Sequence, residues 1–128
     1  MAVEFREIRR GEVAEALAFA AGLGLSVEAA ELEPQLSLIA LGRDRVTLGT
    51  ALHSRDAAGR RCIAVQLAES APPGLARLLI DRALRKAEAR GTTTTHIRIC
   101  GQDIEQQTWS GADLLTRLQA TVGPRQVA

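Results

Sequence analysis

Residues 62–99 contain the pattern that most restricts the fold of this chain. An alternating apolar segment (62–68) is followed by a stretch with proline and glycine, a helical periodicity (75–90), a glycine and a β-branched segment (92–100). Two strands separated by a helix of this length pair in parallel through a right-handed crossover. A loop that leads from a strand into a helix also points backbone N–H groups at the helix start, where they can hold a phosphate. The segment therefore predicts a βαβ unit with an anion site.

The residues before this unit predict an antiparallel meander that ends in the strand at 62–68. Residues 36–41 are apolar on both faces, as in an inner strand, and residues 46–54 alternate between apolar and polar. Turn-forming residues follow each of these two segments, at 42–45 and 55–61. The fold class is therefore α/β, with a mixed, mostly antiparallel sheet and helices on both faces.

The two ends of the chain have weaker patterns. Residues 3–8 predict a short strand, and residues 12–21 and 27–33 predict two helices. For residues 101–108 the pattern leaves two alternatives open, a loop and a weak strand. A length of 128 residues fits one domain that spans residues 1–128.

The charge balance argues against a nucleic-acid partner. The chain has 16 basic and 15 acidic residues and a net charge of +1. Proteins that bind nucleic acid usually combine a basic stripe with stacking aromatic residues. This chain has two Phe, one Trp and no Tyr, so we expect no nucleic-acid binding.

Cysteine content and hydropathy predict a cytoplasmic protein. Cys62 and Cys100 lack CxxC spacing, which argues against a zinc site and a disulfide scaffold, and we expect no disulfide between them. His53 and His96 are isolated in the sequence, so we expect no metal site. No segment approaches the roughly 18 apolar residues of a membrane span, and the N-terminus lacks the apolar run of a signal peptide. We therefore expect no membrane partner.

The order of elements resembles that of the GNAT acyltransferases, a family whose members use acetyl-CoA. The resemblance is best over residues 37–99. In that family the loop before the long helix has a Gln/Arg-x-x-Gly-x-Gly/Ala pattern, whose amides hold the pyrophosphate of the cofactor. The pattern falls on residues 71–76, where Gly74 and Ala76 match it.

This resemblance implies a binding site for acetyl-CoA or another acyl-CoA. Backbone groups at the end of the strand would orient the pantetheine arm, and those at the helix start would hold the pyrophosphate. The residues implied are Val65, Gln66 and Leu67 for the arm, and Gly74, Leu75, Ala76 and Arg77 for the phosphates.

The sequence also departs from the family pattern in the loop and near its C-terminus. Ala71 stands where the family has Gln or Arg, and Pro72 and Pro73 each lack an N–H group that could bind phosphate. The family usually continues with a helix and two strands on the acceptor side. Only residues 101–128 are available for them here.

Arg77 is consistent with an anion at the helix start. The first turn of the predicted helix contains this arginine and no acid, whereas a helix without a ligand there prefers Asp or Glu by about 0.3–1 kcal/mol. The alternative, that Arg77 points sideways into solvent, stays open.

Two residues are candidates for catalysis. Glu69 follows the central strand and could deprotonate an amine; the alternative is a solvated loop carboxylate. Cys100 ends the next strand and could act as a general acid or nucleophile; the alternative is a small buried hydrophobic residue.

Two functional hypotheses follow. One is an acyl-CoA-dependent N-acyltransferase with an unknown acceptor, whose activity is retained or lost. The other is a non-catalytic GNAT-fold module for binding or dimerisation, with a second copy of the chain as a candidate partner. A gap between the strands at 62–68 and 92–100 would favour a cofactor slot, and pairing along their whole length would indicate that the slot has closed.

Overall fold

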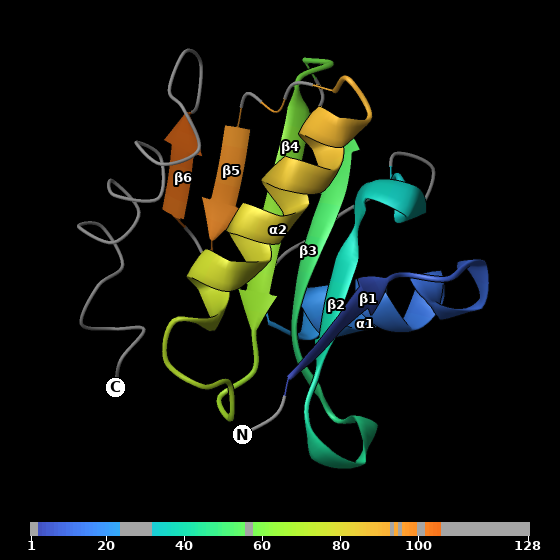
Figure 1. The fold of residues 1–128 in the computed structure, drawn as a ribbon, viewed down its shortest axis with the longest axis vertical. Helices are drawn as coiled ribbons and strands as arrows, with labels where there is room; N and C mark the ends of the chain where they lie inside the picture. Colours follow the sequence, from blue (N-terminus) through green and yellow to red (C-terminus); the bar gives the residue numbers. More distant parts are fainter. Residues whose placement is uncertain are drawn as a thin grey trace.

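A computed structural model describes residues 3–23, 32–55, 58–92, 94, 96–99 and 102–105 of the chain. Its strands form one six-stranded sheet in the order β1-β2-β3-β4-β5-β6 (Figure 1). Only β4 and β5 pair in parallel; the other neighbours are antiparallel. The strands are β1 (Glu4–Glu7), β2 (Leu38–Leu41), β3 (Thr47–Arg55), β4 (Arg61–Leu67), β5 (His96–Ile99) and β6 (Gln102–Glu105).

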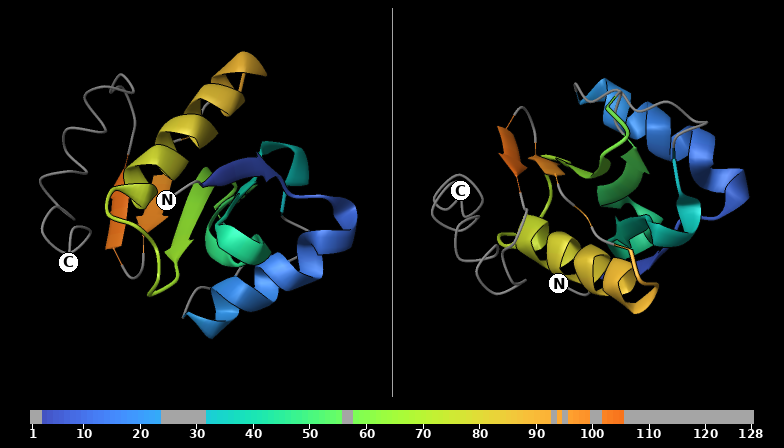
Figure 2. Two further views of the ribbon diagram at one scale, coloured as in Figure 1. Left: turned by 60° about the horizontal axis from the view of Figure 1, so that its bottom comes forward. Right: turned by 90° about the horizontal axis from the view of Figure 1, so that it is seen from above.

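Among the described residues, the α-helices α1 (Val13–Gly22) and α2 (Leu75–Ala89) cover opposite faces of the sheet (Figure 2). The apolar face of α2 packs on one side and Ala16 and Ala20 of α1 pack on the other. The buried residues of α2 are Leu75, Ala76, Leu79, Ile80, Ala83, Leu84 and Ala87. Their helical spacing is the signal that predicted this element. The predicted mixed α/β sheet with helices on both faces is confirmed.

Strand β3 has a different burial pattern from the predicted alternation. All residues from Leu48 to Ser54 are buried, including the polar Thr50 and His53. The cause is the position of β3 in the sheet, since both helix layers cover it. The register with β2 also shifts at the start of this strand: Ala40 pairs with Gly49 and Leu41 with Thr47, so Leu48 is an extra, bulged residue of β3.

The predicted helix at 27–33 is wrong at its C-terminal end. Leu32 forms a β-bridge with Ser54, and the N–H of Glu33 donates to the carbonyl of His53 at 2.8 Å. These two residues are therefore extended beside β3. Residues 24–31 lie outside the described part of the chain.

Two further boundaries differ from the prediction. The 3₁₀ turn Pro34–Leu36 delays the start of β2, and β5 begins only at His96, later than the predicted strand at 92–100. Of the two alternatives left open for residues 101–108, the strand applies to Gln102–Glu105, which form β6; the other residues of that range lie outside the described part of the chain. The end of α2 is as expected: Gly91 has a φ of +71°, and the N–H of Thr92 donates to the carbonyl of Ala87 at 2.9 Å.

Candidate functional site

The described pairing of the parallel strands β4 and β5 covers only part of β4. The register runs from Cys62 opposite His96 to Val65 opposite Ile99. Ile99 also pairs with Gln102 of the antiparallel strand β6. Strand β4 continues to Leu67, and no described residue pairs with its last two positions on the β5 side.

The backbone N–H and C=O of Leu67 point toward the β5 side of β4, where no described residue pairs with them. The N–H of Ala68 donates to the carbonyl of Leu48 in β3 at 2.9 Å. Because backbone groups alternate in direction along a strand, the N–H and C=O of Leu67 face away from β3. They therefore lie where an extended ligand could add to the edge of β4, as a peptide adds to a sheet edge.

The loop between β4 and α2 ends in a left-handed glycine. Gly74 has a φ of +80° and precedes the helix without a side-chain cap. The N–H of Leu75 donates to the carbonyl of Pro72 at 3.3 Å, whereas no described backbone carbonyl accepts from the N–H of Gly74 or Ala76. These two donors, together with the helix dipole, favour an anion.

The side chains around this helix start leave room for a ligand above Gly74. A β-carbon placed on Gly74 would meet no atom within 4 Å. Leu75 and Ala76 are fully buried, backbone included, whereas Gly74 is partly exposed. Arg77 is exposed and is the charged residue of the first turn, which contains no acid.

The other predicted site residues occupy distinct positions. Val65 is buried on the α2 face, while Gln66 is buried on the opposite face. Glu69 lies exposed in the turn that directly follows β4. Among the described residues, no side chain is bonded to its carboxylate in a way that would assist it as a base. Cys100 lies outside the described residues, so its predicted role and the expected absence of a disulfide stay predictions.

The departure at Ala71 has a structural explanation. Its side chain is half-buried and packs against the core between α2 and the sheet. The N–H of Ala71 donates to the carbonyl of Ala68 at 3.0 Å, which tightens the loop. A long polar side chain at this position would have to leave the core, so the loop is built around a small residue.

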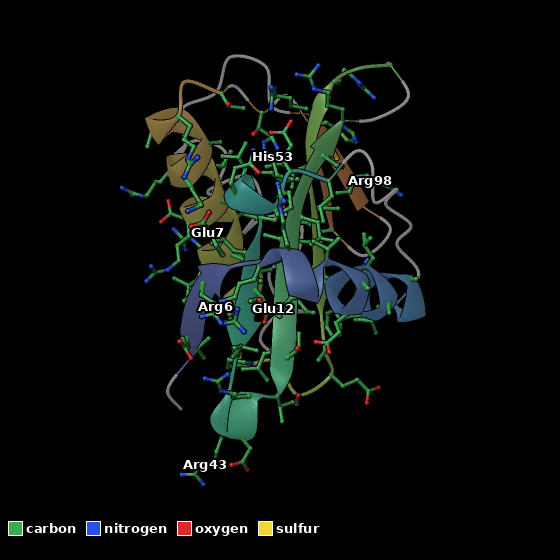
Figure 3. All side chains as sticks on the ribbon, turned by 90° about the vertical axis from the view of Figure 1, so that its right-hand side faces the viewer. Arg6, Glu7, Glu12, Arg43, His53 and Arg98 are labelled. Atoms are coloured by element: carbon green, nitrogen blue, oxygen red, sulfur yellow. The ribbon has the colours of Figure 1, made fainter. Side chains whose placement is uncertain are left out.

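Sequence reasoning missed a polar cluster at the other end of β4. His53 is buried there with Thr94 and Glu33, as Figure 3 shows for His53 near the end of the sheet. The same figure places Arg98 of β5 on the side of the sheet away from α2. No local signal marks His53, because its partners come from distant parts of the sequence.

The described residues contain no helix of the length and hydropathy needed to span a bilayer. Within the same residues, no three His, Cys, Asp or Glu side chains are grouped so that they could ligate a metal ion.

Comparison with known proteins supports the fold. No protein-family model and no curated protein matches the sequence. Among solved structures, the chain is similar to nourseothricin acetyltransferase, with a TM-score of 0.50 and 18% identity, over 77% of this chain and 73% of that one. It is also similar to a GNAT-family acetyltransferase from Staphylococcus aureus Mu50, with a TM-score of 0.49 and 11% identity, over 95% of this chain and 84% of the other. The predicted GNAT-like fold is confirmed, as a fold.

Proposed function

We propose that this chain binds an acyl-CoA at the end of β4 and the start of α2, and transfers the acyl group to an amine. The observation that carries the proposal is the direction of the backbone of Leu67, whose N–H and C=O face away from β3 beyond the last described β4–β5 pair, Val65 and Ile99. A pantetheine arm contains amide groups that could add to this edge like a short strand.

The loop supports the proposal at the phosphate end. The N–H groups of Gly74 and Ala76 lack described backbone acceptors, and the space above Gly74 is open. Arg77 adds a positive charge beside them. The partly exposed N–H of Gly74 and the exposed charge of Arg77 are the groups that favour a pyrophosphate here.

The chemistry proposed for the site depends mainly on positioning. When bound, an acyl-CoA would supply a thioester whose carbon is attacked by the amine, with the CoA thiol as the leaving group. The backbone at Leu67 would fix the arm in a single orientation, which accounts for much of the rate in such reactions. Glu69 is the candidate to accept a proton from the amine, because it lies exposed just beyond β4.

The second candidate function is a non-catalytic binding or dimerisation module. The observation that favours it is the composition of the loop: Pro72 and Pro73 have no N–H, and Ala71 is packed against the core. The carbonyl of Pro72 also occupies the N–H of Leu75. The loop thus has fewer donors for a phosphate than the pattern it resembles.

Calorimetry with CoA and acetyl-CoA distinguishes the two functions. We expect saturable binding by the native chain and its loss in Gly74→Glu, because the new carboxylate would enter the space beside the loop and repel phosphate. Gly59→Glu is the matched control. Gly59 has nearly the same φ of +81° and the same open surroundings, so it carries the same backbone strain and charge in the turn before β4.

Two results of this calorimetry would contradict different parts of the proposal. Absence of binding at millimolar cofactor would rule out the acyltransferase and support the binding module. If Gly74→Glu and Gly59→Glu both bind the cofactor as tightly as the native chain, the protein binds a cofactor, but not at this loop.

A further inference from the structure

A buried histidine lies at the end of β4 that is remote from the proposed cofactor site. His53 pairs with Ile63 near the start of β4, whereas Gly49 pairs with Leu67 at its end. The residue has no exposed surface. A buried imidazole is tolerated only where protein groups satisfy its polar atoms, so its surroundings indicate its role.

The backbone of His53 is held by the segment that precedes β2. Its carbonyl accepts from the N–H of Glu33 at 2.8 Å, and its N–H donates to Oγ of Ser37 at 2.8 Å. Oγ of Ser37 in turn donates to the carbonyl of Glu33 at 2.9 Å. These three bonds fix the segment against β3.

The ring of His53 joins this segment to the connection between α2 and β5. Nε2 lies 3.1 Å from Oγ1 of Thr94, which belongs to that connection. Nδ1 lies 3.9 Å from Oε2 of Glu33. The ring is therefore the point at which two segments distant in sequence are held to β3.

The order of carboxylate, imidazole and hydroxyl is that of a hydrolase relay, but the environment favours another role. Thr94 is only 3% exposed, so a substrate has no access to its hydroxyl. Both oxygens of Glu33 lie 2.9 Å from Nη1 of Arg61, which occupies the carboxylate. Glu33 is partly exposed, and Nδ1 of His53 is buried without a hydrogen-bond partner among the described residues, 3.9 Å from the Glu33 carboxylate.

The charges around the ring oppose one another. Burial lowers the pKa of His53 below its ordinary value of 6.5, Glu33 acts in the opposite direction, and Arg61 of β4 lowers it further. Arg55 at the end of β3 also lies 3.9 Å from Glu33. In the neutral ring one nitrogen can accept from the hydroxyl of Thr94, whereas both nitrogens of an imidazolium must donate.

We propose that Glu33, His53 and Thr94 form an acid-sensitive latch, which holds the α2–β5 connection against the end of the sheet and opens when His53 takes up a proton. Protonation places a charge in a buried site and requires the bond to Thr94 to reverse, with Nε2 donating and the hydroxyl accepting. The new charge also attracts Glu33, whose carboxylate is held by Arg61. This inference does not depend on the proposed function.

An NMR titration of the histidine rings tests the latch, with His96→Gln used to assign the two ring signals. We expect the pKa of His53 to lie below 6.5, and the amides of Thr94 and β5 to shift along the same titration. Glu33→Gln should lower the pKa of His53 further and Arg61→Gln should raise it, because each removes one of the opposing charges.

Urea unfolding between pH 7 and pH 5 gives a second measurement. Because the unfolded chain binds the proton more tightly, the unfolding equilibrium constant should rise by up to about tenfold per pH unit below 6.5, until the folded pKa is reached. His53→Gln should flatten this dependence, and His96→Gln should leave it unchanged. If His53→Gln does not fold, Thr94→Val replaces it: it should increase amide exchange of residues 92–99 at pH 7.

Two results would overturn the latch. One is a His53 that titrates at or above 6.5. The other is a set of Thr94 and β5 amides that stay unchanged while the ring titrates.

Discussion

At the scale of single residues, this protein buries more polar groups than its sequence pattern indicates. Thr50, His53, Gln66 and Thr94 are all at least nine-tenths buried. His53 and Thr94 bond to each other, whereas Oγ1 of Thr50 has no hydrogen-bond partner among the described residues. A buried hydroxyl without a partner costs the free energy of removing it from water.

Replacing Thr50 by valine should therefore stabilise the protein. Valine has nearly the same shape and no hydroxyl to desolvate, so we expect the free energy of unfolding to rise by about 1 kcal/mol in urea denaturation. Thr47→Val, at the half-buried start of the same strand, serves as control and should change stability by less than about 0.5 kcal/mol. A Thr50→Val variant less stable than the native chain would show that the hydroxyl has a partner.

At the scale of elements, the proximity of α2 to the sheet depends on a glycine in β3. A β-carbon on Gly49 would lie 2.9 Å from the carbonyl oxygen of Gln66 and 3.0 Å from Cδ1 of Leu79. The missing side chain lets α2 pack directly over the β3–β4 pair. The loop before α2 is joined to the start of this helix. The distance between α2 and the sheet therefore also positions the proposed phosphate donors of the loop.

Replacing Gly49 by alanine should separate α2 from the sheet. The clash involves backbone in a neighbouring strand, which cannot move without breaking the ladder, so we expect a loss of about 1–3 kcal/mol in the free energy of unfolding. Gly11→Ala is the control, since a β-carbon there meets no atom within 4 Å. Equal stability of the two variants would contradict the contact.

A second pair of contacts attaches α2 to the edge strand β1. The guanidinium of Arg82 lies 4.5 Å from the ring centroid of Phe5, and Nζ of Lys86 lies 3.4 Å from an oxygen of Glu7. The side chains of Arg82 and Lys86 cover part of β1, as long basic side chains often cover apolar surface.

At the scale of the whole molecule, two pH-dependent contacts lie on different elements. Their ionisable groups take up protons in different pH ranges. One is the latch at His53. The other joins Arg6 of β1 to Glu12 in the turn before α1, and Figure 3 shows the two side chains pointing toward each other. The hydrogen bond from Arg6 and the N–H of Arg9 lower the pKa of Glu12 from 4.5 to about 2.

The free energy of unfolding should therefore fall in two steps on acidification. Both folded-state pKa values are lowered, so each contribution is complete above the unfolded pKa and is lost as the pH falls. The first step begins below pH 6.5 and belongs to His53, and the second runs from pH 4.5 toward pH 2 and belongs to Glu12. Urea unfolding at successive pH values measures both.

Two variants assign the steps. His53→Gln should remove the first step only, and Glu12→Gln the second only. Glu15→Gln removes an exposed carboxylate from α1 and should retain both. A Glu12→Gln variant with an unchanged second step would show that Arg6 does not stabilise the folded state through this carboxylate.

What the sequence by itself determined is the order of elements and the position of α2. The period of its apolar residues, the left-handed Gly74 before it and Gly91 after it are local signals, since each depends on neighbours within a few positions. The GNAT-like sheet followed from the same order. Local periodicity also located the loop that we propose binds phosphate.

The register of β5 between β4 and β6, and the surroundings of His53, could be read only from the folded chain. The first depends on Ile99 pairing with both Val65 and Gln102, and the second on Glu33 and Thr94 meeting at one ring. Such contacts join residues far apart in the chain, and no local propensity determines them. The physical reason is that pairing register and burial are set by the packing of all layers together.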